Sequence, residues 1–187
     1  MASAAIFHPA LISAEEYLNS SYEPDMEFVD GLLEDRAIPT FAHNMLERFL
    51  LFHFAQFEGE LGFTVVHEVR TTIIAGARYR IPDVMLISAT GKIGKTCDLV
   101  PWVVVEVLSP DDTIPRTRAR FRDYADRGVA NLVLMDPEEC VAYRFEADWL
   151  TLREFKNLTL PTGEIPFDTS EIFGKLRAKL ASREQES

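Results

Sequence analysis

The stretch that decides the fold is Trp102-Val103-Val104-Val105-Glu106-Val107-Leu108, an apolar run with one acidic residue inside it. Such a run is typical of a strand that is buried on both faces of a sheet. An ionised Glu106 would be costly there unless a positive charge compensates for the water that it loses. A second stretch, Ile81-Pro82-Asp83-Val84-Met85-Leu86-Ile87, repeats the pattern with Asp83 as its acidic residue. The two carboxylates predict a divalent cation shared by neighbouring core strands.

Length and composition predict one globular domain over residues 1–187, large enough to bury a hydrophobic core. No stretch reaches the roughly 20 apolar residues that cross a bilayer. Met1–Pro9 has no basic start and too short an apolar run for a secretory signal. Cys97 and Cys140 show no metal-ligand spacing, so neither a disulfide framework nor a zinc site is expected. We therefore expect a cytoplasmic protein with no membrane partner.

The charge of the chain is uneven. The formal net charge of -11 argues against a protein that coats nucleic acid non-specifically, because an acidic body repels phosphate. One short segment is nevertheless rich in arginine, with Arg116, Arg118, Arg120, Arg122 and Arg127. These arginines could form either a solvated helix face or part of a site.

The order of the predicted elements indicates an α/β or α+β fold, with one mixed sheet flanked by helices and an N-terminal hairpin. Residues 13–155 form the expected core, and residues 170–187 form a tail. The expected elements are a capped helix at 13–18, a hairpin at 26–35 turning at Asp30-Gly31, a helix at 43–60, strands at 63–74, 79–88 and 102–108, a helix at 115–127, strands at 131–136, 140–146 and 149–155, and a helix at 170–180.

Strand and helix geometry predict that the side chains of Asp83, Glu106 and Arg120 lie at a similar depth along the sheet. Alternation puts Glu106 on the face of Val104, and neighbouring strands can bring Asp83 beside it. Glu106 lies three residues before Ser109, which follows the strand, and so about 10 Å down the strand at 3.3 Å per residue. Arg120 lies about 7.5 Å into the following helix at 1.5 Å per residue, so it can reach the same depth. Oxygen ligands with open positions suit Mg²⁺ or Mn²⁺.

Several motifs together resemble those of the Uma family of restriction endonucleases, within the PD-(D/E)xK nuclease superfamily. The resemblance extends over about residues 13–155. It is carried by Glu27-Phe28-Val29-Asp30-Gly31, His43, Ile81-Pro82-Asp83-Val84, Pro101 to Pro110, Tyr124, Gly128-Val129 and Met135-Asp136-Pro137.

This resemblance implies a restriction-endonuclease-like core in which Asp83, Glu106 and the backbone carbonyl of Val107 bind the metal. The superfamily has a lysine two residues after the glutamate, where this chain has Leu108. Uma proteins are similar in carrying that lysine on the next helix, and this chain has Arg120 at that position. Arginine stays charged, so Arg120 could stabilise negative charge on the phosphate but not readily accept a proton.

Each candidate also has a structural explanation. Glu106 could be half of a buried ion pair, and Arg120 its partner or part of a solvated helix face. Asp83 could be an ordinary strand-end aspartate. His43 could cap a helix or lie in the core, and the resemblance makes it a site candidate. Glu27 could be a surface ion-pair partner or an additional acidic ligand.

The leading hypothesis is an Mg²⁺- or Mn²⁺-dependent endonuclease that hydrolyses DNA, with Asp83, Glu106, Arg120, His43 and Glu27 as the catalytic group. One alternative is a nuclease fold that has lost its chemistry and serves as a binding or assembly module. Another keeps the metal but acts on RNA or a small phosphodiester. Nucleases of this fold usually pair to cut both strands, so a homodimer is expected by analogy.

Overall fold

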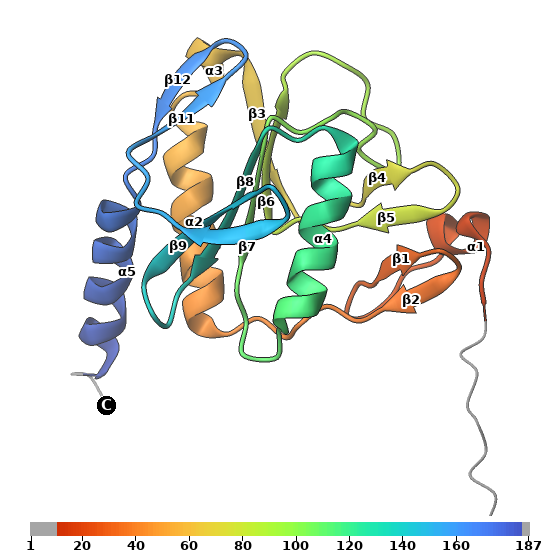
Figure 1. Cartoon of the computed structure of the whole chain (residues 1–187), viewed down its shortest axis with the longest axis horizontal. Coiled ribbons are helices and arrows are strands. Elements are labelled where there is room, and N and C mark those ends of the chain that lie inside the picture. Colours follow the sequence, from red (N-terminus) through yellow and green to blue (C-terminus); the bar gives the residue numbers. More distant parts are fainter. Residues whose placement is uncertain (1–10, 185–187) are drawn as a thin grey trace, which may run out of the picture.

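A six-stranded mixed sheet forms the centre of the computed structural model, which describes residues 11–184 (Figure 1). The strand order is β10-β9-β8-β7-β6-β3. Only β7 and β8 are parallel among these neighbouring pairs. The strands are β3 (Phe63–His67), β6 (Val84–Ser88), β7 (Val103–Val107), β8 (Asn131–Asp136), β9 (Val141–Glu146) and β10 (Trp149–Leu152). The predicted mixed sheet flanked by helices is confirmed.

The parallel pair β7 and β8 is connected by α4 (Ile114–Arg127), which crosses one face of the sheet. Pro115 lies in the first turn of α4, where its missing N–H has no helical partner to lose. The helix ends at Gly128, whose φ of 97° is a conformation that favours glycine. Both ends agree with the sequence prediction. Phe121 and Tyr124 are the large buried side chains that α4 packs onto the sheet.

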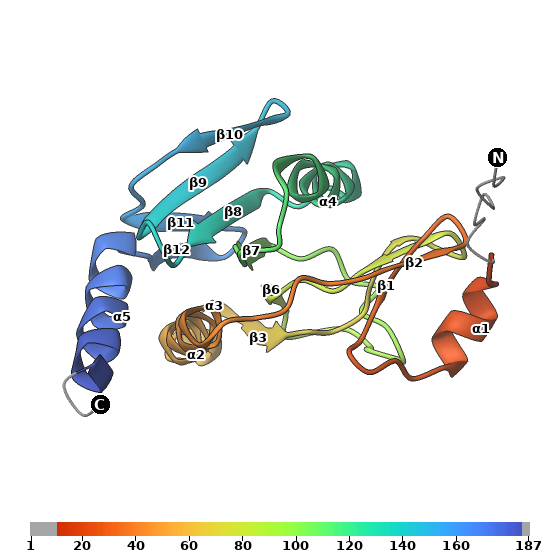
Figure 2. The same ribbon diagram turned by 90° about the horizontal axis from the view of Figure 1, so that it is seen from below.

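The opposite face of the sheet is covered by α2 (Phe41–Ala55) (Figure 2). Its buried side chains Leu46, Leu50 and Phe54 join the larger hydrophobic core. Because α2 and α4 lie on opposite faces, β7 between them is buried on both sides. This arrangement explains why β7 is apolar at every position except Glu106.

A second sheet of four strands, in the order β2-β1-β5-β4, lies beside the first. Its elements are β1 (Glu27–Val29), β2 (Leu32–Glu34), β4 (Thr71–Ile74) and β5 (Arg78–Arg80), and the short helix α1 (Ala14–Asn19) packs against it. The predicted hairpin is confirmed. Asp30 and Gly31 both have positive φ, at 50° and 93°, as the tight turn requires.

Three predicted elements are divided in the structure. The expected strand at 63–74 is β3 and β4, and the expected strand at 79–88 is β5 and β6. Glu68, at a φ of 50°, breaks the first, and Pro82, which has no N–H for a ladder, breaks the second. The expected helix at 43–60 is α2 followed by α3 (Glu58–Leu61). As a result Asp83 lies immediately before β6, where the two sheets meet.

The core continues past Phe155, where the sequence prediction ended it. A hairpin of β11 (Asn157–Leu160) and β12 (Gly163–Pro166) was not predicted. The final helix α5 (Thr169–Glu184) is longer than expected. The buried side chains of this region, which join the same core as α2, are Leu158, Leu160, Ile165, Phe167, Ile172, Phe173 and Leu176.

Two predicted features fall partly or wholly on residues that the structure does not describe. Met1–Pro9, predicted to carry no secretory signal, and residues 185–187 of the predicted tail lie outside the described residues. Within residues 11–184, no helix combines the length and apolar character needed to cross a membrane.

Candidate metal centre

A cavity of about 600 Å³ lies at the junction of the two sheets. One wall comes from the chain before β1, between Tyr22 and Asp25, and from residues 36–39 after β2. Arg36 belongs to this wall, and the remaining lining residues used below are His43, Asp83, Val107, Ser109, Asp112 and Arg120. The structure thus brings four of the predicted site residues to one cavity, while Glu106 lies buried behind its wall.

Asp83 is positioned by the break before β6 and is only 3% exposed. Its Oδ2 accepts a hydrogen bond from the backbone N–H of Val107 at 2.7 Å. Its Oδ1 accepts one from Arg36 at 2.9 Å. Because Val84 pairs with Val105 in the antiparallel ladder, Asp83 stands beside Glu106 at the next register position. The predicted adjacency of the two carboxylates on neighbouring strands is confirmed.

Glu106 is 2% exposed and is held by two groups of α4. The hydroxyl of Tyr124 donates to its Oε1 at 2.6 Å, and Arg120 donates to its Oε2 at 3.2 Å. Burial raises the pKa of Glu106 above its ordinary value, and the charge of Asp83 raises it further, whereas Arg120 lowers it. The predicted depth of Arg120 is therefore confirmed by direct contact.

Arg120 is shared between two carboxylates. Besides Glu106 it binds Asp112, in the loop between β7 and α4. Burial alone would lower the pKa of Arg120, but the charge of Glu106 raises it, so the guanidinium remains cationic. The arrangement is a fixed positive charge at the cavity wall and offers no proton acceptor.

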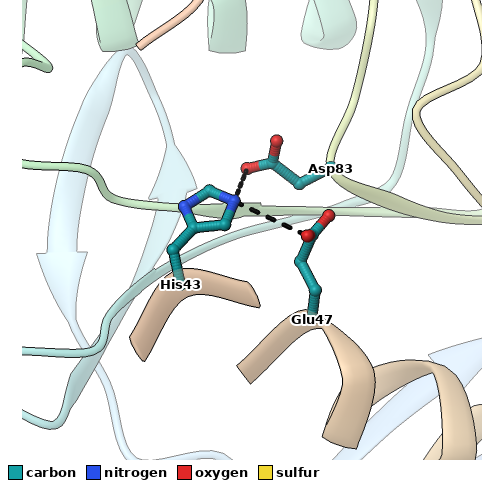
Figure 3. Close-up of side chains that lie close together, drawn as sticks. All are labelled: His43, Glu47 and Asp83. Carbon is teal, nitrogen blue, oxygen red and sulfur yellow. Dashed lines mark ion pairs between the residues drawn. The ribbon is translucent and has the colours of Figure 1, made fainter. Parts of the chain in front are cut away.

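His43 lies in the first turn of α2, which Thr40 caps by accepting from the backbone N–H of His43. Its Nδ1 lies 3.0 Å from the hydroxyl of Ser109. Its Nε2 faces Asp83 Oδ2 at 3.9 Å and Glu47 Oε2 at 3.8 Å (Figure 3). Burial lowers the pKa of His43, which favours the neutral imidazole.

Two residues of the site were missed from the sequence: Arg36, which lines the cavity, and Glu47, which lies behind His43 of the cavity wall. Glu47 lies one helical turn after His43, and burial raises its pKa from the ordinary 4.5 to about 8. A histidine and a glutamate four residues apart on a helix share one face, and this spacing could have identified Glu47. Arg36 follows the hairpin in an irregular segment, and no sequence pattern indicated its contact with Asp83.

Glu27 is not part of the cavity wall. Its Oε2 accepts from Arg80 at 2.7 Å and its Oε1 from the backbone N–H of Ile81 at 3.0 Å. Arg80 also binds Asp123 and Glu34. Glu27 is 2% exposed, so it is half of a buried ion pair rather than of the surface pair considered from the sequence. Its two oxygens thus join β1 to β5 and to the residue that follows β5.

A donor set at the edge of the cavity fits a divalent cation. His43, Glu47 and Asp83 each offer one ligand atom, and the three atoms lie within 4.8 Å of one another. Carboxylate and imidazole donors are ordinary ligands of divalent ions in proteins. One oxygen of Glu47, Oε1, is buried without a hydrogen-bond partner in the described part of the chain. A bound cation would satisfy it.

Comparison with known proteins identifies the family. The profile of the Uma2 family, whose description is "Putative restriction endonuclease", matches residues 14–168. The chain belongs to the Uma2 family. This confirms the resemblance that the motifs of the sequence indicate, and the match extends past residue 155 to the start of α5.

A solved structure supports the fold of this Uma2 member. It is the crystal structure of a protein from Anabaena variabilis described as a "putative nuclease belonging to DUF820". The two chains are 18% identical with a TM-score of 0.73, over 88% of this chain and 99% of the other. At this identity the similarity establishes the fold alone. A search among curated proteins returned no match.

Proposed function

We propose that this Uma2-family chain is a divalent-metal-dependent endonuclease that hydrolyses DNA phosphodiester bonds. One observation carries the proposal: Asp83 and Glu106 stand side by side on adjacent core strands, with Val107 beside them and the cation of Arg120 in contact with Glu106. A buried pair of carboxylates with an adjacent cation is costly for a structural role alone, which supports a functional one.

The residues of the chain have distinct proposed roles. Asp83, Glu106 and the carbonyl of Val107 would hold Mg²⁺ or Mn²⁺. When bound, such an ion polarises the phosphoryl group and lowers the pKa of its water. Arg120 stabilises the negative charge that develops on the phosphorus-bound oxygens. Arg36, the second cation of the cavity, is placed to contact the phosphate as well, because it already lies 2.9 Å from Asp83.

The test is nicking of supercoiled plasmid DNA in Mg²⁺ or Mn²⁺ by the wild type and by Glu106→Gln. We expect wild-type nicking that requires the ion and is lost in the variant. Mn²⁺ is included because its geometric demands are looser than those of Mg²⁺. Nicking that persists in Glu106→Gln would refute the proposed site. Cleavage of RNA or of a small phosphodiester in place of DNA would change the substrate class.

A second candidate function is a binding or assembly module without turnover. The observation that favours it is that Arg120 forms ion pairs with both Glu106 and Asp112. The resemblance to Uma proteins implies a lysine at this position. The other arginines of α4 are also engaged: Arg118 and Arg122 bind Asp148, and Arg116 and Arg127 bind the backbone carbonyls of residues 35 and 98. Nicking gained by Arg120→Lys would indicate a chemically weakened nuclease.

We further propose that residues 1–187 act as one domain and that two copies pair to cut both strands. The pairing is inferred by analogy with nucleases that cleave duplex DNA. Sedimentation of the protein with and without a DNA duplex tests it. We also propose that the protein acts in the cytoplasm.

A further inference from the structure

The strongest unexplained feature beside the cavity is the carboxylate of Glu47, which faces His43 of the cavity wall. The residue is 8% exposed, and its Oε1 is buried without a hydrogen-bond partner among residues 11–184. Its other oxygen, Oε2, lies 3.8 Å from His43 Nε2, which is longer than a hydrogen bond. A buried carboxylate that lacks a close partner is costly, and the sites where this cost persists are often functional.

The side chains around Glu47 converge on one point. His43 and Glu47 come from successive turns of α2, and Asp83 comes from the segment before β6 (Figure 3). The separations from His43 Nε2 are 3.8 Å to Glu47 and 3.9 Å to Asp83, and all three ligand atoms lie within 4.8 Å. Two ligands at about 2.1 Å from one octahedral ion lie about 3.0 Å apart in cis and about 4.2 Å apart in trans. Shifts well under 1 Å would close the cluster around an ion.

The imidazole is already oriented for this task. Ser109 Oγ lies 3.0 Å from His43 Nδ1. When Nδ1–H donates to this hydroxyl, Nε2 carries the free lone pair and faces the two carboxylates. Histidine ligands of metals are commonly fixed in this way by a partner on the second ring nitrogen. Ser109 would thus act as a positioning residue for the ligand.

We propose that His43, Glu47 and Asp83 form a second cation position that prefers a transition-metal ion such as Mn²⁺, Co²⁺ or Zn²⁺ over Mg²⁺. The preference follows from the imidazole nitrogen, because Mg²⁺ is served best by oxygen donors. The inference rests on the proposed function in one respect: Asp83 would be shared with the Asp83–Glu106–Val107 position. Its other two ligands, both on α2, are independent of that position.

The first test is titration of the metal-free protein with Co²⁺, followed by visible absorption, because the d–d bands change in position and intensity when protein ligands replace water around the ion. The wild type is compared with Glu47→Gln, with Glu106→Gln, and with Glu60→Gln as a control at an exposed position of α3. We expect Glu47→Gln to weaken Co²⁺ binding at least about tenfold, an effect seen even for residues that only orient a ligand. Glu60→Gln should match the wild type, and Glu106→Gln should retain the bands of protein-bound Co²⁺.

A second measurement, nuclear magnetic resonance of the histidine nitrogens, tests metal binding by His43 without a variant and without an activity assay. Zn²⁺ should shift the nitrogen-15 resonance of His43 Nε2 and leave those of the other three histidines in place. Thermal unfolding without metal verifies that Glu47→Gln is folded. Co²⁺ affinity unchanged in Glu47→Gln, or an unshifted His43 resonance, would overturn the second position. Even then, loss of plasmid nicking in Glu106→Gln would support the proposed endonuclease function. Failure of the second cation position can therefore be distinguished from failure of the proposed function.

Discussion

Replacing Arg120 with methionine removes the cation beside Glu106 and keeps a side chain of similar length. Glu106 is 2% exposed, and the side chain of Arg120 is 13% exposed, so water cannot readily take the place of the lost guanidinium. Removing one partner of a buried ion pair costs about 3–5 kcal/mol. Tyr124 still donates to one Glu106 oxygen, which limits the loss. We therefore expect the free energy of unfolding to fall by about 3 kcal/mol at about pH 8.

The loss of stability in Arg120→Met should depend on pH, and it should be smaller when Glu106 is replaced as well. Because burial raises the pKa of Glu106, its carboxyl can take up a proton in Arg120→Met, and the loss should shrink toward pH 5. Glu106→Gln alone should cost less, since Arg120 keeps Asp112. The double variant should lie nearer to Glu106→Gln than to the sum of the two single changes, with a coupling energy of about 2 kcal/mol.

Urea unfolding of the metal-free protein measures these free energies, and about 3 kcal/mol corresponds to a Tm lower by about 6–12 °C for a chain of this size. The control is Arg122→Met, on the same helix, where the arginine side chain is 51% exposed. We expect the control to lose at most about 0.5 kcal/mol. A loss for Arg120→Met no larger than that of the control, or additive effects in the double variant, would refute the electrostatic account of Glu106.

Two further predictions concern Glu47 and Glu27. The folded protein holds the Glu47 proton up to a pKa of about 8, against 4.5 ordinarily. The metal-free protein should therefore lose stability as pH rises from about 4.5 to 8. The loss is on the order of a few kcal/mol, and Glu47→Gln should flatten this decline in a series of thermal melts. Glu27→Gln should lower the free energy of unfolding by about 1–3 kcal/mol, because Arg80 and the N–H of Ile81 lose a charged acceptor. Its Co²⁺ and Mn²⁺ affinities, measured by calorimetry, should stay within about twofold of the wild type, and a larger change would make Glu27 a ligand.

The contact between Glu106 and Arg120 could be predicted because it depends on local regularities. The apolar run fixes the depth of Glu106 in β7, and Pro115 and Gly128 fix the ends of α4. The rise per residue of a strand and of a helix then places both side chains at one level. No long-range information was needed beyond the rule that a parallel crossover brings the helix back over the sheet.

The division of the strands at Glu68 and Pro82 could not be predicted in the same way. Apolar β-branched residues stand within two positions of each break, Val66 and Val69 around Glu68, and Ile81 and Val84 around Pro82. The strand pattern therefore continues while the chain passes from one sheet to the other. Glu47 was missed for a related reason. Its burial depends on how α2 lies against the strand ends, and a glutamate on an amphipathic helix is exposed in most proteins. The hairpin of β11 and β12 had a usable signal, the alternation of Leu158 and Leu160 before a turn at Gly163.

The two explanations of Arg120 can be separated because they predict opposite relations between stability and activity. As a structural cation, arginine is the better choice, since its planar guanidinium binds Glu106 and Asp112 at once. Arg120→Lys should then lower the free energy of unfolding and give no nicking. If the position serves phosphate chemistry, the same substitution should lower stability and raise the nicking rate, because lysine can share a proton. Stability and nicking measured on one preparation of Arg120→Lys therefore decide whether this Uma2 member retains the chemistry of its fold.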